Sequence, residues 1–196
     1  MNNIFITPNR KRSIQYEKGF VLIAALVFLL VLTIFSVSMF RNFGLQEKIA
    51  GNVREKQRAF HSAQSALQFG EWFLTQGSAN SGSLCNTLLD ANAGETKVCS
   101  NALADPTDVP WQVGSTDVGV TYIPPTTPPM VVSTSGGANT YFAVPRFYIF
   151  YLGLDSTGIN SLYQVTAMGF GGSSNGIAVV QSTYAVSTGI KDLGGL

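Results

Sequence analysis

Two cysteines and one histidine are the side chains that most readily suggest chemistry in this 196-residue chain. Cys85 and Cys99 lie in a region rich in Ser, Asn and Gly, and their even number and loop-like setting favour a disulfide in an oxidising compartment. Closing a loop of roughly 15 residues would stabilise the fold by about 3 kcal/mol. Two free thiols, or half of a metal site, are the alternatives, although no CxxC motif or nearby His supports a metal.

The single histidine, His61, stands between Phe60 and Ser62 in a helical pattern, with no adjacent nucleophile in a recognisable arrangement. We interpret it as a surface or contact residue of a helix. The sequence has no GxSxG motif, no phosphate-binding glycine loop and no dinucleotide fingerprint, and GFGG at 169–172 follows a strand pattern without a helix after it. We therefore expect no enzyme, no metal site and no cofactor.

Charge is distributed unevenly along the chain. Residues 1–19 carry four bases against the single acid Glu17, a net charge of +3. From Trp72 onward, three bases stand against seven acids, a net charge of −4. This acidic region argues against direct binding to nucleic acid, whose phosphates require a basic surface.

An uninterrupted apolar segment follows the basic leader. Residues 20–40 hold no charged side chain, and their only polar side chains are Thr33, Ser36 and Ser38. Twenty-one helical residues span roughly 31 Å, which is enough to cross a bilayer. The positive leader predicts a cytoplasmic N-terminus, with everything after this transmembrane segment on the far side of the membrane.

The helical pattern continues beyond the apolar segment, through residues 41–76. Gly44 and Gly51 each weaken such a helix by about 1 kcal/mol relative to alanine, either as tolerated positions or as places where the helix bends or melts. GSANSGS at 77–83 ends the pattern. The apolar residues recur mostly three, four or seven positions apart and predict one stripe of an amphipathic helix: Leu45, Ile49, Val53, Phe60, Ala63, Leu67 and Leu74.

We expect residues 77–196 to form a head domain. Residues 77–139 have a loop-like composition, with short strand candidates at 111–113 and 118–123. Pro145 is expected at an edge, a bulge or a strand start. The fold class is α+β, with the amphipathic helix packed on a small antiparallel sheet. That sheet is predicted over residues 140–188, from runs rich in β-branched and aromatic residues at 141–154, 161–170 and 176–188.

Three interpretations of the apolar segment differ in what happens at its ends. A secretory signal would be removed after Ser36-Val37-Ser38, but the apolar region of such signals runs only about 7 to 15 residues. A plain membrane anchor leaves Gly19, at the border between charge and hydrocarbon, unexplained. The third interpretation rests on a resemblance to a known family.

The stretch KGFVLIAALVFLLVLT resembles the class III signal of type IV pilins and pseudopilins. The resemblance implies that a prepilin peptidase removes a cytoplasmic leader, residues 1–19, by cutting between Gly19 and Phe20. It also implies that the new terminal amine, on Phe20, is methylated. The implied fold is the type IV pilin fold, in which a long N-terminal helix is half transmembrane and half amphipathic.

Two further segments resemble the minor pilins of the PilX type. LQEKIAGNVREKQRAFHSAQSAL at 45–67 is similar to that subgroup's LQEKMAGN-x-R-x-x-x-x-AF-x-x-AE-x-AL stretch, although Gln64 stands where that stretch has its acid and Ser65 follows at its unspecified position. YQVTAMGFGGSSNGIAVVQSTYAV is similar to its terminal hairpin. The resemblance implies a minor pilin that packs with other minor pilins and the major pilin and helps to prime pilus assembly. It also suggests a PilY-type adhesin as a partner at the tip.

Ala24 departs from the general pilin pattern, which has a glutamate at this position. In the family, that carboxylate is thought to neutralise the terminal amine of the subunit ahead of it in the filament. A carboxylate in hydrocarbon costs about 2.5–3.5 kcal/mol, so it is kept only where it finds a partner. A subunit without it gains nothing from a neighbour ahead, which predicts a place at or near the pilus tip. A neutral variation in a shaft subunit is the alternative.

Two other functions are compatible with these patterns. One is the tip pseudopilin of a type II secretion system, whose head is usually much larger than the roughly 120 residues that follow this helix. The other is a single-pass periplasmic binding or sensor domain held in the membrane. We expect the chain in the inner membrane first, with its head periplasmic, and then in the pilus.

Overall fold

In the computed structural model, the described residues are 18–136 and 139–187. The chain divides into two compact units between Lys48 and Ile49. Most of the predicted leader, residues 1–17, lies outside the described residues.

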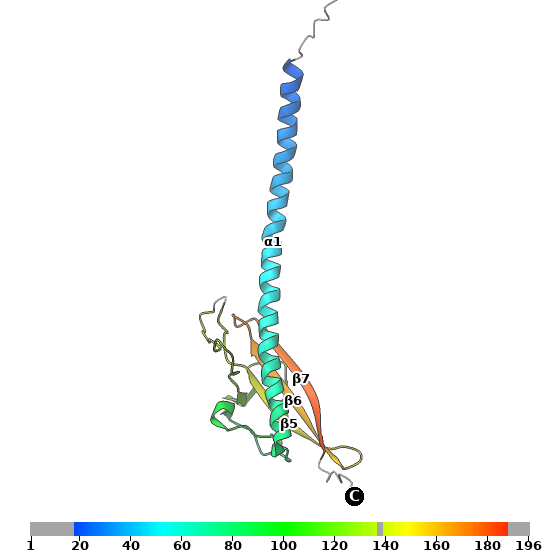
Figure 1. The fold of residues 1–196 in the computed structure, drawn as a ribbon, viewed down its shortest axis with the longest axis vertical. Coiled ribbons are helices and arrows are strands. Elements are labelled where there is room, and N and C mark those ends of the chain that lie inside the picture. Colours follow the sequence, from blue (N-terminus) through cyan, green and yellow to red (C-terminus); the bar gives the residue numbers. More distant parts are fainter. Residues whose placement is uncertain (1–17, 137–138, 188–196) are drawn as a thin grey trace, which may run out of the picture. The chain divides into compact units, whose positions relative to one another are not determined.

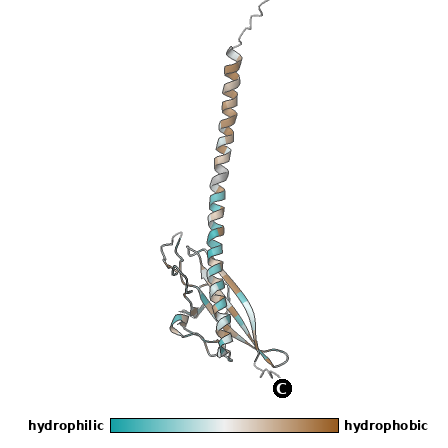
Figure 2. Ribbon diagram, in the orientation of Figure 1, coloured by the Kyte–Doolittle hydropathy of each residue, from teal (hydrophilic) through white to brown (hydrophobic). Residues whose placement is uncertain are grey.

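Helix α1 (Lys18–Phe73) is 56 residues long. Figure 2 shows apolar residues dominating its N-terminal part and polar residues following them. The helix continues through Gly44 and Gly51. It ends in a wider turn, Leu74–Ser78, where Gly77 adopts a left-handed φ of 77°. Glycine reaches that conformation without the steric penalty of a Cβ, so the glycine-rich stretch predicted to stop the helix does so.

A sheet of five strands forms in the second unit, in the order β1-β4-β5-β6-β7. The pairs from β4 to β7 are antiparallel, and the β1–β4 pair is parallel. A short separate hairpin and one 3₁₀ turn, η2 (Ala91–Ala93), complete the elements. The strands of the sheet are β1 (Leu88–Asp90), β4 (Gly119–Thr121), β5 (Arg146–Leu154), β6 (Asn160–Phe170) and β7 (Ile177–Ser187), and those of the hairpin are β2 (Gln112–Val113) and β3 (Thr116–Asp117).

The predicted α+β fold is confirmed, and the sheet differs from the prediction in two respects. The first predicted strand begins at Arg146 rather than at Tyr141, directly after Pro145, which has no N–H to give to a ladder. Strand β1 was not predicted, and its parallel pairing with β4 makes the sheet mixed rather than purely antiparallel. Three residues in a polar loop carry too little alternation to be recognised as a strand.

The sheet is covered on both faces, because side chains alternate along β5. Phe147 and Ile149 belong to a core shared with α1, which lies across β5, β6 and β7 (Figure 1). Tyr148 points to the other face and packs in a second core with Trp111 and Met168. Burial raises the pKa of Tyr148 to about 12, and its hydroxyl donates to the carbonyl of Asn101 (2.8 Å). Part of the predicted loop region therefore covers one face of the sheet.

Candidate functional site

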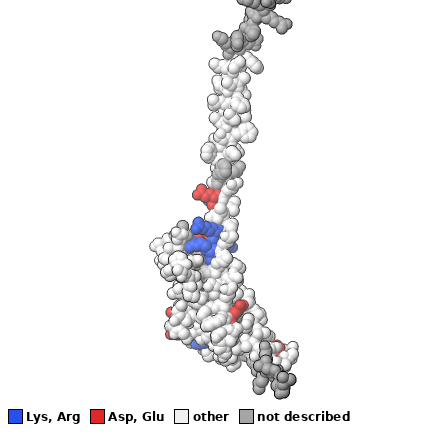
Figure 3. All heavy atoms as spheres, viewed as in Figure 1, with Lys and Arg blue, Asp and Glu red and all other residues white. Residues whose placement is uncertain are grey.

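The apolar part of α1 is not covered by any other described residue of its own unit. Every large apolar side chain from Phe20 to Phe40 is between 41% and 76% exposed. Figure 3 shows no acid or base on the visible face of this apolar part among the described residues. Such a surface is unfavourable in water and requires either lipid or other apolar helices around it.

Two of the three polar side chains in this segment donate hydrogen bonds to the helix itself. The Thr33 hydroxyl donates to the carbonyl of Leu30 (2.7 Å), and the Ser36 hydroxyl donates to the carbonyl of Leu32 (2.9 Å). In hydrocarbon, internal hydrogen bonds of this kind remove the penalty of a bare hydroxyl. Among the described residues, one helix is long and apolar enough to span a membrane by length and composition, and it contains this segment.

The residues predicted for processing lie on α1. Gly19, Phe20 and Ala24 are all exposed within the helix. A Cβ added at Gly19 would meet no other atom within 4 Å, so packing inside the chain does not require a glycine there.

The two cysteines form a disulfide. Cys85 and Cys99 are both buried, their Cα atoms are 5.4 Å apart, and both belong to the second core. The backbone at Cys99 is also bonded to strand β5, since the N–H of Cys99 donates to the carbonyl of Ile149 (2.7 Å). The bridge therefore fixes the loop after α1 to strand β5.

Small residues form the contact between α1 and the sheet in the second unit. Ala59, Ala63 and Ala66 are fully buried. A Cβ added at Gly169 on β6 would lie 2.3 Å from the backbone nitrogen of Ala63 and 2.6 Å from the carbonyl oxygen of Ala59. At this separation no larger side chain fits between the two backbones. We call Ala59, Ala63, Ala66, Gly70 and Gly169 the small-residue contact.

Polar residues hold α1 to the hairpin between β6 and β7. Glu55 accepts a hydrogen bond from the backbone N–H of Gly172 and pairs with Arg58 at 3.1 Å. Arg58 in turn donates to the carbonyl of Thr140 and lies 4.7 Å from the ring centre of Tyr141. Two charged residues of one helical turn thus connect three segments far apart in the sequence.

The apolar stripe predicted for this half of α1 is only partly the buried face. Ala63 and Leu74 are fully buried and Leu67 is half-buried, as expected. The larger residues of the predicted stripe are exposed. These exposed residues are Leu45, Ile49, Val53 and Phe60.

No group of three or more His, Cys, Asp or Glu side chains placed to hold a metal occurs within 18–136 and 139–187. His61 is exposed, with its ring centre 6.1 Å from that of Phe60. The described residues offer packing surfaces.

A long apolar helix that packs on a small, mostly antiparallel sheet is the layout of the pilins. Two family models match this chain: one described as PilX N-terminal over residues 18–68, and one described as type IV pilus assembly protein PilX C-term over residues 81–186. The chain belongs to the PilX family of type IV pilus assembly proteins. Searches of curated proteins and of solved structures gave no significant match.

Membership of this family implies a minor pilin, associated with the type IV pilus and with other pilins. The family is known as a structural component of the pilus rather than as an enzyme. The apolar helix fits membrane anchoring before assembly.

Proposed function

We propose that this minor pilin helps to prime assembly of the type IV pilus and occupies a position at or near its tip. The observation that carries the proposal is the exposed apolar surface from Phe20 to Phe40, in which Ala24 stands at the position of the usual pilin glutamate. Such a helix can leave lipid for a bundle of similar helices, where packing replaces contact with lipid tails.

Processing would precede assembly. A prepilin peptidase would cut between Gly19 and Phe20, and the amine of Phe20 would then be methylated. Until that step the leader would remain in the cytoplasm and the head in the periplasm, in agreement with the basic residues before the apolar segment. The disulfide between Cys85 and Cys99 suits that oxidising compartment.

Priming would require this subunit to assemble with neighbouring subunits. The partners proposed are other minor pilins, the major pilin and a PilY-type adhesin at the tip. In the second unit, Ile49, Val53 and Phe60 are also exposed, and a neighbouring subunit could cover them.

The priming role is tested by deleting the gene and counting pili by electron microscopy. We expect few or no pili, with their number restored by the wild-type chain supplied in trans. Pili of normal number and length in the deletion strain would contradict the priming role.

The tip position is tested with Ala24→Glu, using Ala25→Glu as the matched control on the same stretch of helix. Immunogold labelling of the head should place the wild-type subunit at pilus ends. Glutamate at 24, but not at 25, should move label into the shaft, because only there can it pair with the terminal amine of a subunit ahead. Label that lies along shafts and tips alike, unchanged by Ala24→Glu, would contradict the tip position.

A further inference from the structure

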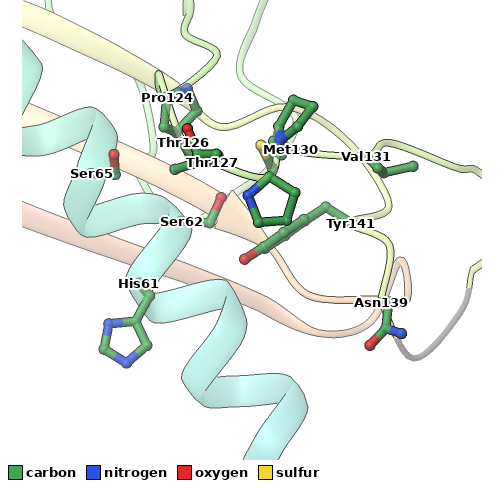
Figure 4. A pocket seen from close by; sticks show the side chains of 12 residues that line it. His61, Ser62, Ser65, Pro124, Thr126, Thr127, Met130, Val131, Asn139 and Tyr141 are labelled. Atoms are coloured by element: carbon green, nitrogen blue, oxygen red, sulfur yellow. The ribbon is translucent and has the colours of Figure 1, made fainter.

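A pocket of about 420 Å³ lies in the second unit, between α1, the proline-rich loop 124–131 and the segment 139–141. Figure 4 shows Ser62 and Ser65 approaching it from the helix, and Tyr141 forming its opposite side. Its size is in the range of sites for small molecules. Neither the apolar helix nor the small-residue contact requires it.

Ser62 is the polar side chain of this pocket whose hydrogen bonding is incomplete. Its side chain is only 5% exposed, and its hydroxyl has no hydrogen-bond partner, which is true of no other buried side-chain nitrogen or oxygen in the described part of the chain. The hydroxyl points into the pocket (Figure 4). Buried hydroxyls are nearly always paired, so a ligand with a polar group at this point would complete the site.

The lining of the pocket contains no Asp, Glu, Lys or Arg. Arg58 approaches the ring of Tyr141, but its charge is already engaged by Glu55 and it does not line the pocket. The ring of His61 points away from the cavity (Figure 4). A phosphate, a carboxylate or an ammonium group would therefore be desolvated without a counter-charge, and the ligand should be neutral.

The backbone around the pocket is poorly suited to an extended peptide. Prolines in the loop have no N–H, and the N–H of Tyr141 already donates to the carbonyl of Val131 (2.8 Å). The carbonyl of Tyr141 in turn accepts from the N–H of Ser133 (2.8 Å). A peptide that adds as a strand needs a row of free main-chain groups. Because the main-chain groups here are bonded or absent, side chains must recognise the ligand. This favours a compact ligand over an extended peptide.

We propose that this pocket binds one pyranose ring of a neutral glycan. A pyranose ring combines an apolar face of C–H groups with hydroxyls that both donate and accept. The ring of Tyr141 and the proline rings supply apolar surface for that face, and Ser62, Thr127 and Asn139 supply polar side chains for the hydroxyls. Free sugar and a glycan displayed on a surface share this chemistry.

The proposal is tested with the full chain in a detergent that has no sugar headgroup. Saturation-transfer difference NMR is recorded with methyl glucoside, methyl galactoside and methyl N-acetylglucosaminide as probes. We expect at least one to bind in the millimolar range. Ser62→Ala should weaken that binding about three- to tenfold, as for the loss of one hydrogen bond. Val131→Trp, at an exposed lining position, should abolish it by filling the pocket.

Ser156→Ala is the control, because Ser156 is exposed in the turn between β5 and β6. It should bind as the wild type does, and circular dichroism should show all three variants folded. Binding to free sugar is then compared with binding to the same sugar at the end of an immobilised oligosaccharide. Tighter binding to the oligosaccharide indicates that the natural ligand is a displayed glycan, and equal binding indicates free sugar. Binding by none of the probes, or equal binding by the wild type, Ser62→Ala and Val131→Trp, would overturn the proposal. Pilus assembly would be unaffected by either result.

Discussion

Gly169 is the residue at which α1 and the sheet come closest. A methyl group there would meet the backbone of Ala63 and Ala59 well inside van der Waals distance. Neither neighbour can move without displacing the helix, because both contacts are with main-chain atoms. Glycine is therefore needed at position 169 because there is no space for a side chain.

We predict that Gly169→Ala lowers the free energy of unfolding by about 1–3 kcal/mol, since overpacking forces backbone shifts. Urea unfolding followed by tryptophan fluorescence measures this, with Gly176→Ala as the matched control. At Gly176 an added Cβ would lie 3.4 Å from its nearest neighbour, the Ser173 Oγ, which is ordinary contact. Equal stability of the two variants would show that helix and sheet are not in close contact at Gly169.

Asp117 is a second residue that gives a testable prediction, because its contacts change the pKa of its carboxyl. Its carboxylate accepts from the Gln112 side-chain amide (3.0 Å) and pairs with the Arg146 guanidinium (2.9 Å). These two interactions, the Gln112 hydrogen bond first, lower the pKa of Asp117 below its usual value of 3.8. The charged form is favoured in the folded state, and it connects β3 to the first residue of β5.

Because the pKa of Asp117 is lower when folded than when unfolded, its contribution to stability is present above about pH 4. It should be lost as the pH falls through the folded pKa. We predict that the wild-type chain loses more stability between about pH 5 and pH 2 than Asp117→Asn does. Thermal melts over that pH range test this, and identical pH profiles of the two proteins would contradict it.

At the level of single residues, the sequence predicts those whose partner follows from an even count of one residue type or from a motif. The cysteine pair was predicted in this way. Glu55 and Ser62 were not, because the Glu55 partner Gly172 is 117 positions away and the Ser62 pocket is closed by a loop that has no periodic pattern. Polar residues on a helix carry no sequence signal that distinguishes a long-range contact from a solvated surface.

Among the elements, α1 was predictable because its apolar pattern extends over many residues. The three long strands were predictable because long runs there are rich in β-branched and aromatic residues. The face by which α1 contacts the sheet was not. Hydropathy favours large apolar residues for a buried face, whereas close packing selects Ala, Ser and Gly at positions such as Ala59, Ser62 and Gly70. The small-xxx-small spacing from Ala59 to Ala63 was the available signal.

The loop between α1 and β4 depends on its disulfide. We predict that the double variant Cys85→Ala/Cys99→Ala loses about 3 kcal/mol of unfolding free energy, because a loop with a sequence separation of 14 is no longer closed in the unfolded state. Urea unfolding measures the loss. Reduction of the wild-type chain with dithiothreitol is the comparison and should give a similar value. An unchanged midpoint in both would mean that the bridge contributes nothing to stability.

At the scale of the whole molecule, the described residues of the first unit form no buried core, whereas the second unit has two. The apolar helix of the first unit depends on lipid or on other helices, while the second unit buries its own large side chains. That contrast is expected of a subunit that is stored in a membrane and then assembled. It agrees with membership of the PilX family, and the tip position and priming role remain the proposal built on it.

The most direct test of that proposal is the N-terminal mass of this chain recovered from purified pili. We predict a mature subunit that begins at Phe20 with a methylated amine, present in small amount relative to the major pilin. A mature start at Met39 would indicate a secreted protein, and an intact leader would indicate a plain anchor. Either of these, or consistent absence of the chain from pili, would contradict the account.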